Sequence, residues 1–285
     1  MPGTKMLKAL KNKLRPIYHF LINKAAGKYI AGETLLLAQG AINRNANNTI
    51  GYWDGDDDSI ETIVDQYLES IEAIKHNENG SYISIKVPSI KYNYELMDKI
   101  IHKAVECGVA IHFDSLDIDT ADKNLEVALY CKQAGVKSVS ISLPARWARS
   151  EKDAMWASRN GIVCRVIKGQ WEDPSYVDID TNKNFLSLIS LLSKQDILVR
   201  VATHDFKLLK DSIEILKSNS KYEIELLYGL PSYQIIKFAD LRHEPIRTYI
   251  PYGHSWVPYC LENLKGNPLV ILNILRDSFL SAIKA

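Results

Sequence analysis

Residues 164–171 read Cys164-Arg165-Val166-Ile167-Lys168-Gly169-Gln170-Trp171, a short β-rich run followed by a glycine, Gly169. The run begins as a buried strand, yet it places two cations, Arg165 and Lys168, near its end. A buried charge without a partner is costly, so we expect both side chains to face an anionic or electron-rich group where the strand ends. Enzyme barrels build their active sites at this end of their strands. Two exposed cations at a strand edge are the alternative interpretation.

Short β-rich runs alternate with helical patterns from about residue 49 onward. Apolar residues recur at helical spacing in Ile60–Lys75 and Leu96–Cys107. Three glycines, Gly108, Gly135 and Gly161, follow a helix and precede a strand, where a left-handed helix cap is expected. The expected strands are Thr49–Trp53, Tyr82–Val87, Val109–Asp114, Ser138–Ser142, Ile162–Lys168, Ile197–Val201, Tyr222–Leu227 and Pro245–Ile250.

Eight strand–helix units predict an α/β fold, a TIM-like (β/α)8 barrel, which usually takes about 250 residues. We place the barrel at residues 49–285 and expect residues 1–48 to form an N-terminal helical segment that packs on it. An open doubly wound sheet is the alternative. No GxGxxG motif follows the first strand, so the sequence does not support a Rossmann nucleotide site.

The composition is that of an ordinary globular chain. Its 285 residues are 46% hydrophobic and 24% charged, enough for one barrel-sized domain or two small ones. The formal net charge of +1 gives no global field that favours nucleic acid as a partner. The four cysteines lie far apart without a CxxC spacing, which favours reduced structural thiols and a cytoplasmic location. No apolar run approaches the roughly 18 residues that span a bilayer, and nothing resembles a cleavable signal.

The segment Met6–Lys24 is basic and amphipathic, with leucines and lysines at helical spacing. Such a helix can lie on an anionic membrane surface, or it can pack on the body of its own protein. Both interpretations stay open, so a peripheral membrane contact is an expectation beside the cytoplasmic location.

Charged and polar residues recur where other expected strands end. Lys86 ends the second strand and Asp114 the third, so an ion pair between them is geometrically natural. A buried lysine at a barrel mouth is alternatively a Schiff-base nucleophile, although an adjacent carboxylate keeps its amine protonated. Together the strand ends predict a pocket for an anionic group or a flavin. The further polar residues at this rim are Thr203, His204 and Asp205 after the sixth strand and Tyr249 in the eighth.

A metal site and a hydrolase triad have little support in the sequence. His204 and Asp205 are metal-ligand residue types, and His112 and Asp114 alternate along one strand, but no third ligand is obvious. No GxSxG elbow marks a nucleophilic serine. We therefore expect no metal.

The chain also carries short motifs in a fixed order, and in that order and spacing they resemble one family. The motifs are Gly32-Glu33-Thr34, Ser84-Ile85-Lys86, Phe113-Asp114, Arg165-Val166-Ile167-Lys168-Gly169, Ala202-Thr203-His204, Leu227-Tyr228-Gly229-Leu230, Tyr249-Ile250-Pro251-Tyr252-Gly253, Trp256 and Pro258-Tyr259. This series resembles the flavin-dependent proline dehydrogenases over nearly the whole chain. The close spacing from Gly253 to Tyr259 resembles the monofunctional bacterial enzymes rather than the large bifunctional ones.

The resemblance implies that FAD binds non-covalently at the carboxyl ends of the barrel strands and that a final helix closes over the substrate. It makes Arg165 the contact near the reactive flavin nitrogen, and Lys86 with Asp114 the pair beneath the substrate; with Tyr249 these are the expected catalytic residues. The other positions match by motif: Ile167, Lys168 and Gly169 line the cofactor, Thr203 and His204 meet its phosphates and adenosine, and Trp171, Leu227, Tyr249 and Tyr259 line the substrate pocket.

The sequence departs from this family at the substrate carboxylate. Family members follow the pocket tyrosine with Arg-Arg, which clamps the proline carboxylate, whereas this chain reads Tyr259-Cys260-Leu261-Glu262-Asn263. Losing two charge-assisted hydrogen bonds, each worth roughly 1.5–3 kcal/mol, and adding a like charge should abolish tight binding of free proline. Three other positions differ: Pro144 replaces a flavin-contacting Gln, Trp171 a Tyr, and Asp205 an Asn.

These observations predict a flavin-dependent dehydrogenase or oxidase that converts an amine to an imine, with a quinone or oxygen as electron acceptor. Glu262 and Asn263 favour a cationic, ester-masked, amide-masked or carrier-tethered proline-like substrate in a specialised biosynthetic pathway. Alternatively, Glu262 is an exposed helix carboxylate that never meets the substrate. The rival functions are a barrel enzyme that has lost FAD and uses Lys86, Asp114 and Arg165 for non-redox chemistry, and a non-catalytic barrel that binds a partner.

Overall fold

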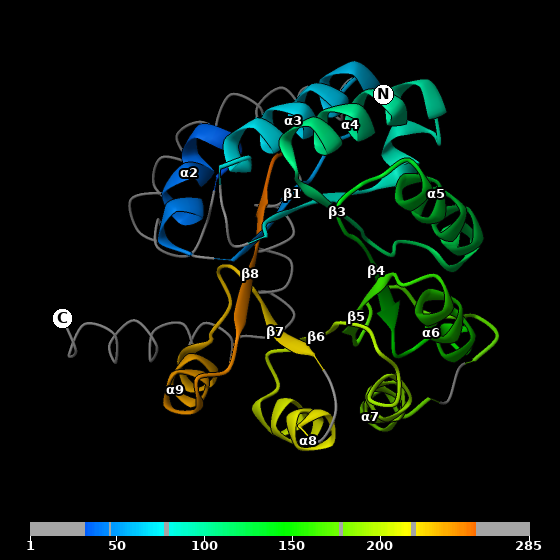
Figure 1. Cartoon of the computed structure of the whole chain (residues 1–285), viewed down its shortest axis with the longest axis vertical. Coiled ribbons are helices and arrows are strands. Elements are labelled where there is room, and N and C mark those ends of the chain that lie inside the picture. The colour runs from blue at the N-terminus through cyan, green and yellow to red at the C-terminus, as the bar shows by residue number, and fades with distance from the viewer. Residues whose placement is uncertain (1–31, 46, 77–79, 177–178, 218–220, 255–285) are drawn as a thin grey trace, which may run out of the picture.

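A computed structural model describes residues 32–45, 47–76, 80–176, 179–217 and 221–254 of the chain. Eight parallel strands form a closed barrel in chain order, and the last strand pairs with the first (Figure 1). The predicted (β/α)8 barrel is therefore confirmed, and the open doubly wound sheet is wrong. The strands are β1 (Asn48–Tyr52), β2 (Tyr82–Ile85), β3 (Ala110–Phe113), β4 (Val139–Pro144), β5 (Val163–Ile167), β6 (Val199–Ala202), β7 (Tyr222–Leu227) and β8 (Ile246–Tyr252).

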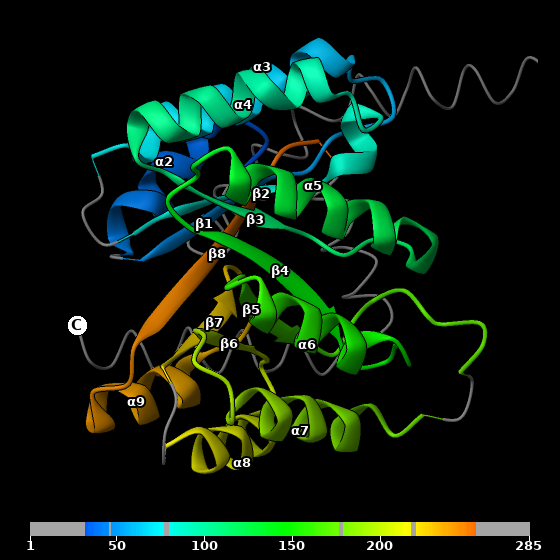
Figure 2. The same ribbon diagram turned by 45° about the vertical axis from the view of Figure 1, so that its right-hand side comes forward.

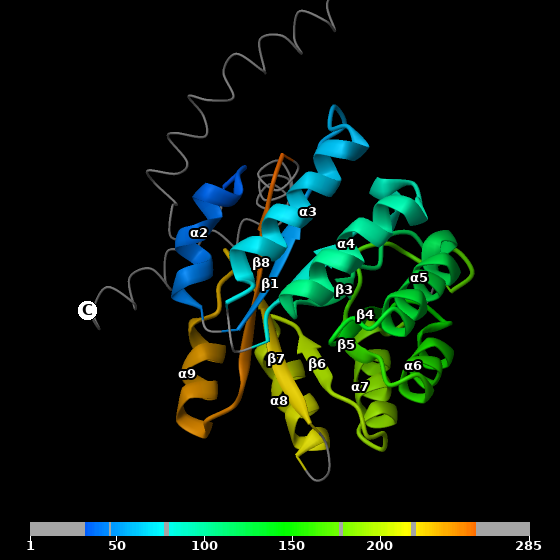
Figure 3. The ribbon, with the colours of Figure 1, turned by 45° about the horizontal axis from the view of Figure 1, so that its top comes forward.

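Helices alternate with the strands and surround the barrel (Figure 2). The helix before β1 packs against β8, and the next two helices follow it around the outside (Figure 3). The helices are α2 (Leu35–Arg44), α3 (Ile60–Ile74), α4 (Tyr94–Cys107), α5 (Ala121–Gln133), α6 (Ser150–Arg159), α7 (Thr181–Leu192), α8 (Phe206–Leu216) and α9 (Tyr233–Arg242), with 3-10 turns η1 (Val87–Ile90) and η2 (Ile118–Thr120).

Local sequence signals explain where several helices begin and end. The Asn93 side chain accepts a hydrogen bond from the Leu96 backbone N–H and starts α4, and Asp205 starts α8 in the same way at Leu208. At the other end of α4, Gly108 takes the left-handed conformation at φ 64°, which glycine adopts without a steric penalty. The expected left-handed glycine at the end of a helix is confirmed here.

The two faces of the barrel sheet differ sharply in polarity. Residues that alternate along each strand point to opposite faces, and the outward face is apolar, as Ile83, Ile111 and Val166 illustrate, all fully buried against the helices. The inward face is polar and charged, and its side chains form hydrogen bonds and ion pairs between strands. The buried polar residues of the strands and their ends include Ser84, Lys86, His112, Asp114, Ser140, Ser142, Arg165, Arg200, Glu225 and Arg247. This barrel thus encloses a charged interior in place of the usual branched apolar one.

Two expectations fall outside the described residues. The basic segment Met6–Lys24 is one, and the final helix with Tyr259, Glu262 and Asn263 is the other. Within the described part of the chain, no helix combines the length and apolar character needed to cross a bilayer. Three of the four cysteines are described, and all three are free thiols.

Candidate active site

Asp114 lies at the centre of the candidate site, directly after β3. Its Oδ1 accepts a hydrogen bond from Nη2 of Arg165 at 2.6 Å, and its Oδ2 accepts one from the Tyr249 hydroxyl at 2.8 Å. The Nζ of Lys86 is more distant, 3.9 Å from Oδ2. The structure therefore brings the four expected catalytic residues together at the carboxyl ends of the strands. The closest partners of Asp114 are Arg165 and Tyr249, not Lys86.

The guanidinium group of Arg165 lies between two carboxylates. Besides Asp114 it contacts Oε1 of Glu225 on β7 at 3.3 Å, and it donates two hydrogen bonds to the Ser142 hydroxyl at 2.7 and 3.2 Å. Burial alone would raise the pKa of Asp114, but the Arg165 cation outweighs burial and holds that pKa well below its ordinary value. Arg165 and Asp114 are therefore both charged at neutral pH, and the guanidinium is fixed in place.

Lys86 follows β2 and is held by two neighbours at the end of β1, Tyr52 and Trp53. Its Nζ donates a hydrogen bond to the backbone carbonyl of Tyr52 at 2.8 Å and lies 4.9 Å from the centre of the Trp53 ring. Burial lowers the pKa of the Lys86 amine, and the attraction of Asp114 does not fully offset that effect. The predicted ion pair with Asp114 exists, but it is long.

Tyr249 reaches into the site from β8. Trp53 donates its indole N–H to the Tyr249 hydroxyl oxygen at 3.3 Å. Burial, followed by the negative charge of Asp114, raises the pKa of Tyr249 well above its ordinary value. The hydroxyl is therefore protonated at neutral pH and acts as a hydrogen-bond donor.

His112 lies one layer below Asp114 on β3. Its two ring nitrogens contact the hydroxyls of Ser140 and Ser142 at 2.8 and 3.0 Å, and Nε2 lies 3.5 Å from Asp114 Oδ1. Burial and the nearby Arg165 cation lower the pKa of His112 to about 4. The ring is thus neutral at pH 7. Over the residues that the structure describes, no group of three or more His, Cys, Asp or Glu is arranged to hold a metal ion.

The rim above β5 and β6 carries an ion pair. Nζ of Lys168 lies 3.1 Å from Oδ2 of Asp205, and the two side chains are 41% and 33% exposed. Asp205 also caps α8 through its other oxygen. Asp205 therefore neutralises Lys168, the cation that the sequence motifs predict at the cofactor.

His204 joins two loops of the rim. Its Nδ1 lies 3.0 Å from the carbonyl oxygen of Pro231, and its Nε2 accepts the Leu227 backbone N–H at 3.0 Å. This pairing defines a neutral ring that donates from Nδ1. Thr203 is buried, and its hydroxyl accepts the Asp205 backbone N–H at 3.1 Å. The structure thus places His204 in direct contact with the backbone of Leu227.

The turn after β5 requires a glycine. Gly169 adopts φ 90°, and a Cβ atom there would approach the Pro144 Cβ to 2.8 Å. The carbonyl oxygen of Ile167 accepts the Ala145 backbone N–H at 2.8 Å, which draws the ends of β4 and β5 together. Trp171, which follows this turn, is 48% exposed and is not among the buried residues of the site.

Sequence reasoning missed a second group of charges deeper in the barrel. Arg200 and Arg247 contact Glu223 at 3.1 and 2.8 Å, and both guanidinium groups lie over the ring of Tyr82, 3.9 and 4.9 Å from its centre. Glu225 contacts Arg165, and the charges of Arg200 and Arg247 act on the Glu225 carboxylate at longer range. The sequence carries a pattern that indicates this group, because Glu223 and Glu225 alternate along a strand whose other residues are apolar. Side chains at alternate positions lie on one face, so both carboxylates can point into the barrel.

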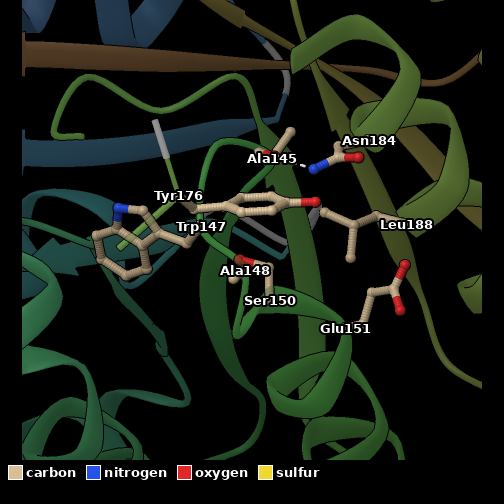
Figure 4. Close-up of a pocket in the computed structure, with 8 residues that line it drawn as sticks. All are labelled: Ala145, Trp147, Ala148, Ser150, Glu151, Tyr176, Asn184 and Leu188. Carbon is tan, nitrogen blue, oxygen red and sulfur yellow. Dashed lines mark hydrogen bonds between the residues drawn. The ribbon is translucent and has the colours of Figure 1, made fainter. Parts of the chain in front are cut away.

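Two cavities lined by described residues adjoin the rim. One of about 20 Å³ reaches Asp114 and Ser142. The other, of about 180 Å³, lies between the β4–α6 loop and α7, with the Tyr176 ring and the Asn184 side chain facing it (Figure 4). Its lining residues are Ala145, Trp147, Ala148, Ser150, Glu151, Tyr176, Asn184 and Leu188. The two cavities share only Trp147, so the larger one is separate from the Asp114 cluster.

No protein-family model and no curated protein sequence matches the chain. Solved structures of proline utilization A match in fold. A bifunctional proline utilization A aligns over 89% of this chain with a TM-score of 0.70 and 15% identity, and the alignment covers 32% of that protein. A mutant of the Bradyrhizobium japonicum protein aligns with a TM-score of 0.69 and 16% identity. That alignment covers 84% of this chain and 30% of the mutant protein. The Bdellovibrio bacteriovorus protein, inactivated by N-propargylglycine, aligns with a TM-score of 0.67 and 17% identity. That alignment covers 80% of this chain and 31% of the Bdellovibrio protein.

The chain thus spans about 30% of the length of these larger proteins. At this level of identity the likeness concerns the fold. The barrel described here has the fold of one part of proline utilization A, in agreement with the proline dehydrogenase-like fold implied by the motifs of the sequence.

Proposed function

We propose that the protein is a flavin-dependent oxidoreductase of the proline dehydrogenase type, which oxidises a C–N single bond of an amine to an imine. The observation that carries the proposal is the position of Arg165, a buried guanidinium fixed between Asp114 and Glu225 at the mouth of the barrel. The fold it shares with proline utilization A supports the same assignment.

The residues of the rim fit an anionic flavin dinucleotide. Arg165 presents a fixed cation, and the turn at Gly169 leaves no side chain over the end of β5. The buried Nε of Arg146 has no hydrogen-bond partner, so a donor remains on the same rim. The Lys168–Asp205 pair is partly exposed and contributes at most about 1 kcal/mol, so a phosphate group can displace Asp205.

When bound, FAD would accept a hydride from the carbon next to the substrate nitrogen. The chain's own residues would bind the cofactor, orient the substrate and exclude water. Arg165, Lys168 and Gly169 would hold the cofactor. Asp114 and Tyr249 would form the floor of the substrate site, where the Tyr249 hydroxyl donates and Asp114 attracts a cationic amine. Burial of this cluster keeps bulk water away from the charges and strengthens their interactions.

The proposed substrate is not free proline. The motif positions that hold Arg-Arg in proline dehydrogenases are Glu262 and Asn263 in this chain. A carboxylate at Glu262 would repel a free α-carboxylate and attract a cation. A cationic, carboxyl-masked or carrier-tethered proline-like amine therefore suits the proposal. The electron acceptor would be a quinone or oxygen, and the reaction would belong to a specialised biosynthetic pathway.

A visible absorption spectrum tests the proposal directly. Purified protein, or protein soaked with FAD, should be yellow, and FAD should raise the melting temperature. The matched control is Lys132→Met, on α5 behind the sheet, which should bind as wild type does, whereas Arg165→Met should lose FAD. Colourless protein with no FAD-dependent change in melting would favour non-redox chemistry at Lys86, Asp114 and Arg165.

A further inference from the structure

A second chemistry fits the mouth of the barrel and needs no flavin. Lys86 stands directly after β2, and its side chain is largely buried at the mouth of the barrel, 11% exposed. Its Nζ is positioned by the Tyr52 carbonyl oxygen at 2.8 Å and by the Trp53 ring at 4.9 Å. Few conformations are open to an amine held in this way.

The charges around Lys86 do not pair it tightly. Asp114 is committed to closer partners, Arg165 at 2.6 Å and the Tyr249 hydroxyl at 2.8 Å, while its distance to Lys86 is 3.9 Å. The other charged groups that act on the amine are Asp54 after β1, which favours the ammonium form, and Arg165 on β5, which disfavours it. Burial is the largest effect and lowers the pKa of Lys86. The neutral amine, which is the nucleophile, is therefore more populated than in an exposed lysine.

We infer that Lys86 is a nucleophilic amine that condenses reversibly with a small aldehyde to form an imine. The Lys86 nitrogen bonds to the carbonyl carbon, the carbonyl oxygen leaves as water after two proton transfers, and no electron acceptor is needed. A proton donor is at hand, because the Tyr249 hydroxyl contacts the same Asp114 oxygen that faces Lys86. The Trp53 ring, 4.9 Å from the Lys86 Nζ, is the aromatic surface that the body of the aldehyde would contact.

This chemistry extends beyond the proposed oxidation. Hydrolysis of the imine product of the proposed oxidation releases a carbonyl compound. An aldehyde-binding amine beside the oxidation site would therefore capture that carbonyl compound. The inference stands without that link, because imine formation depends only on Lys86 and its neighbours.

Reductive trapping tests the inference on the full-length protein. Butanal and sodium cyanoborohydride convert an imine into a stable butyl-lysine, which peptide mapping by mass spectrometry locates. Lys221, 77% exposed, is the internal reference. At pH 7, Lys86 should be butylated several-fold faster than Lys221. The ratio should narrow toward pH 10, where exposed lysines also lose their proton. Butylation of Lys221 with Lys86 unmodified across this pH range would overturn the inference.

A variant separates a reactive amine from a merely structural one. Asp54→Asn removes an anion that favours the ammonium form, so trapping at Lys86 should become faster at pH 7 while trapping at Lys221 stays the same. An unchanged or slower rate at Lys86, in protein that melts as wild type does, counts against the inference. Because the readout is a mass, it is the same for protein with or without bound flavin, and failure of FAD binding leaves the test intact.

Discussion

The Tyr249 ring crosses β1 at Gly51, and only a glycine leaves room for it. The two residues lie on paired strands, and a Cβ atom on residue 51 would overlap the Tyr249 hydroxyl and approach its Cζ to 2.7 Å. The absence of a side chain at Gly51 therefore allows Tyr249 to reach Asp114. A backbone position on one strand thus determines the hydrogen bonding of a carboxylate on another.

Gly51→Ala should destabilise the protein by about 1–3 kcal/mol, the usual result of overpacking a filled interior. The measurement is urea unfolding followed by circular dichroism. Gly40→Ala is the control, because its Cβ would meet only the end of the Arg44 side chain on the exposed face of α2; it should be neutral or stabilising by up to about 1 kcal/mol. Equal stability of the two variants would show that Tyr249 moves aside without loss.

Asp114→Ala should destabilise the fold by about 3–5 kcal/mol, because it leaves the buried cations Arg165 and Lys86 without their shared anion. It should also abolish activity. The control is Asp196→Ala, whose partner Lys221 is exposed, and which should unfold at the wild-type urea concentration. A stable, active Asp114→Ala protein would mean that water already solvates these charges.

Stability should fall as the pH drops from about 6.5 toward 4. The pKa of His112 is lowered from its ordinary value of 6.5 to about 4 in the folded protein, so the unfolded chain takes up the proton first. The contribution of His112 is fully present above pH 6.5 and is lost on the way to pH 4, on the order of 3 kcal/mol. Urea midpoints over this range should fall less steeply in His112→Asn. The exposed His102→Asn should keep the wild-type slope, and an equally steep slope in both variants would contradict the assignment.

Asp205→Asn should strengthen FAD binding, because it frees Lys168 from its anion while an asparagine still caps α8. An exposed pair of this kind is worth up to about 1 kcal/mol, so an increase in affinity of up to about fivefold is expected in fluorescence titrations at low salt. Asp211→Asn, on the same helix, removes the same charge without touching Lys168 and should change affinity little. Weaker binding to Asp205→Asn would show that this carboxylate helps to hold the cofactor.

L-Proline methyl ester, which lacks the free carboxylate, should bleach the bound flavin faster than L-proline. The expectation rests on Glu262 and Asn263 at the positions of the family's Arg-Arg pair, and anaerobic stopped-flow absorbance measures it. The matched experiment is Glu262→Gln, in which free proline should regain part of its rate. Rapid bleaching of the wild-type protein by L-proline would refute this substrate assignment.

The sequence by itself determined the order and type of the barrel elements. Alternation of apolar runs with helical patterns located all eight strands to within a few residues, and Gly108 marked a helix end, because periodicity and glycine conformations are properties of neighbouring residues. The strand-end charges at Lys86 and Asp114 also predicted that charged side chains gather at the carboxyl ends of the strands, as they do.

Only the tertiary structure decided which charges pair. In the closed barrel β5 and β7 lie on either side of β6, so Arg165 meets Glu225, 60 positions away in the chain. Arg165 also contacts Asp114 at a shorter distance than Lys86 does. Spacing along a strand fixes the face on which a side chain lies, but not the distance across the interior to its partner. Those distances follow from the register of eight strands at once, and they determine which cation holds the carboxylate and which amine remains loosely paired.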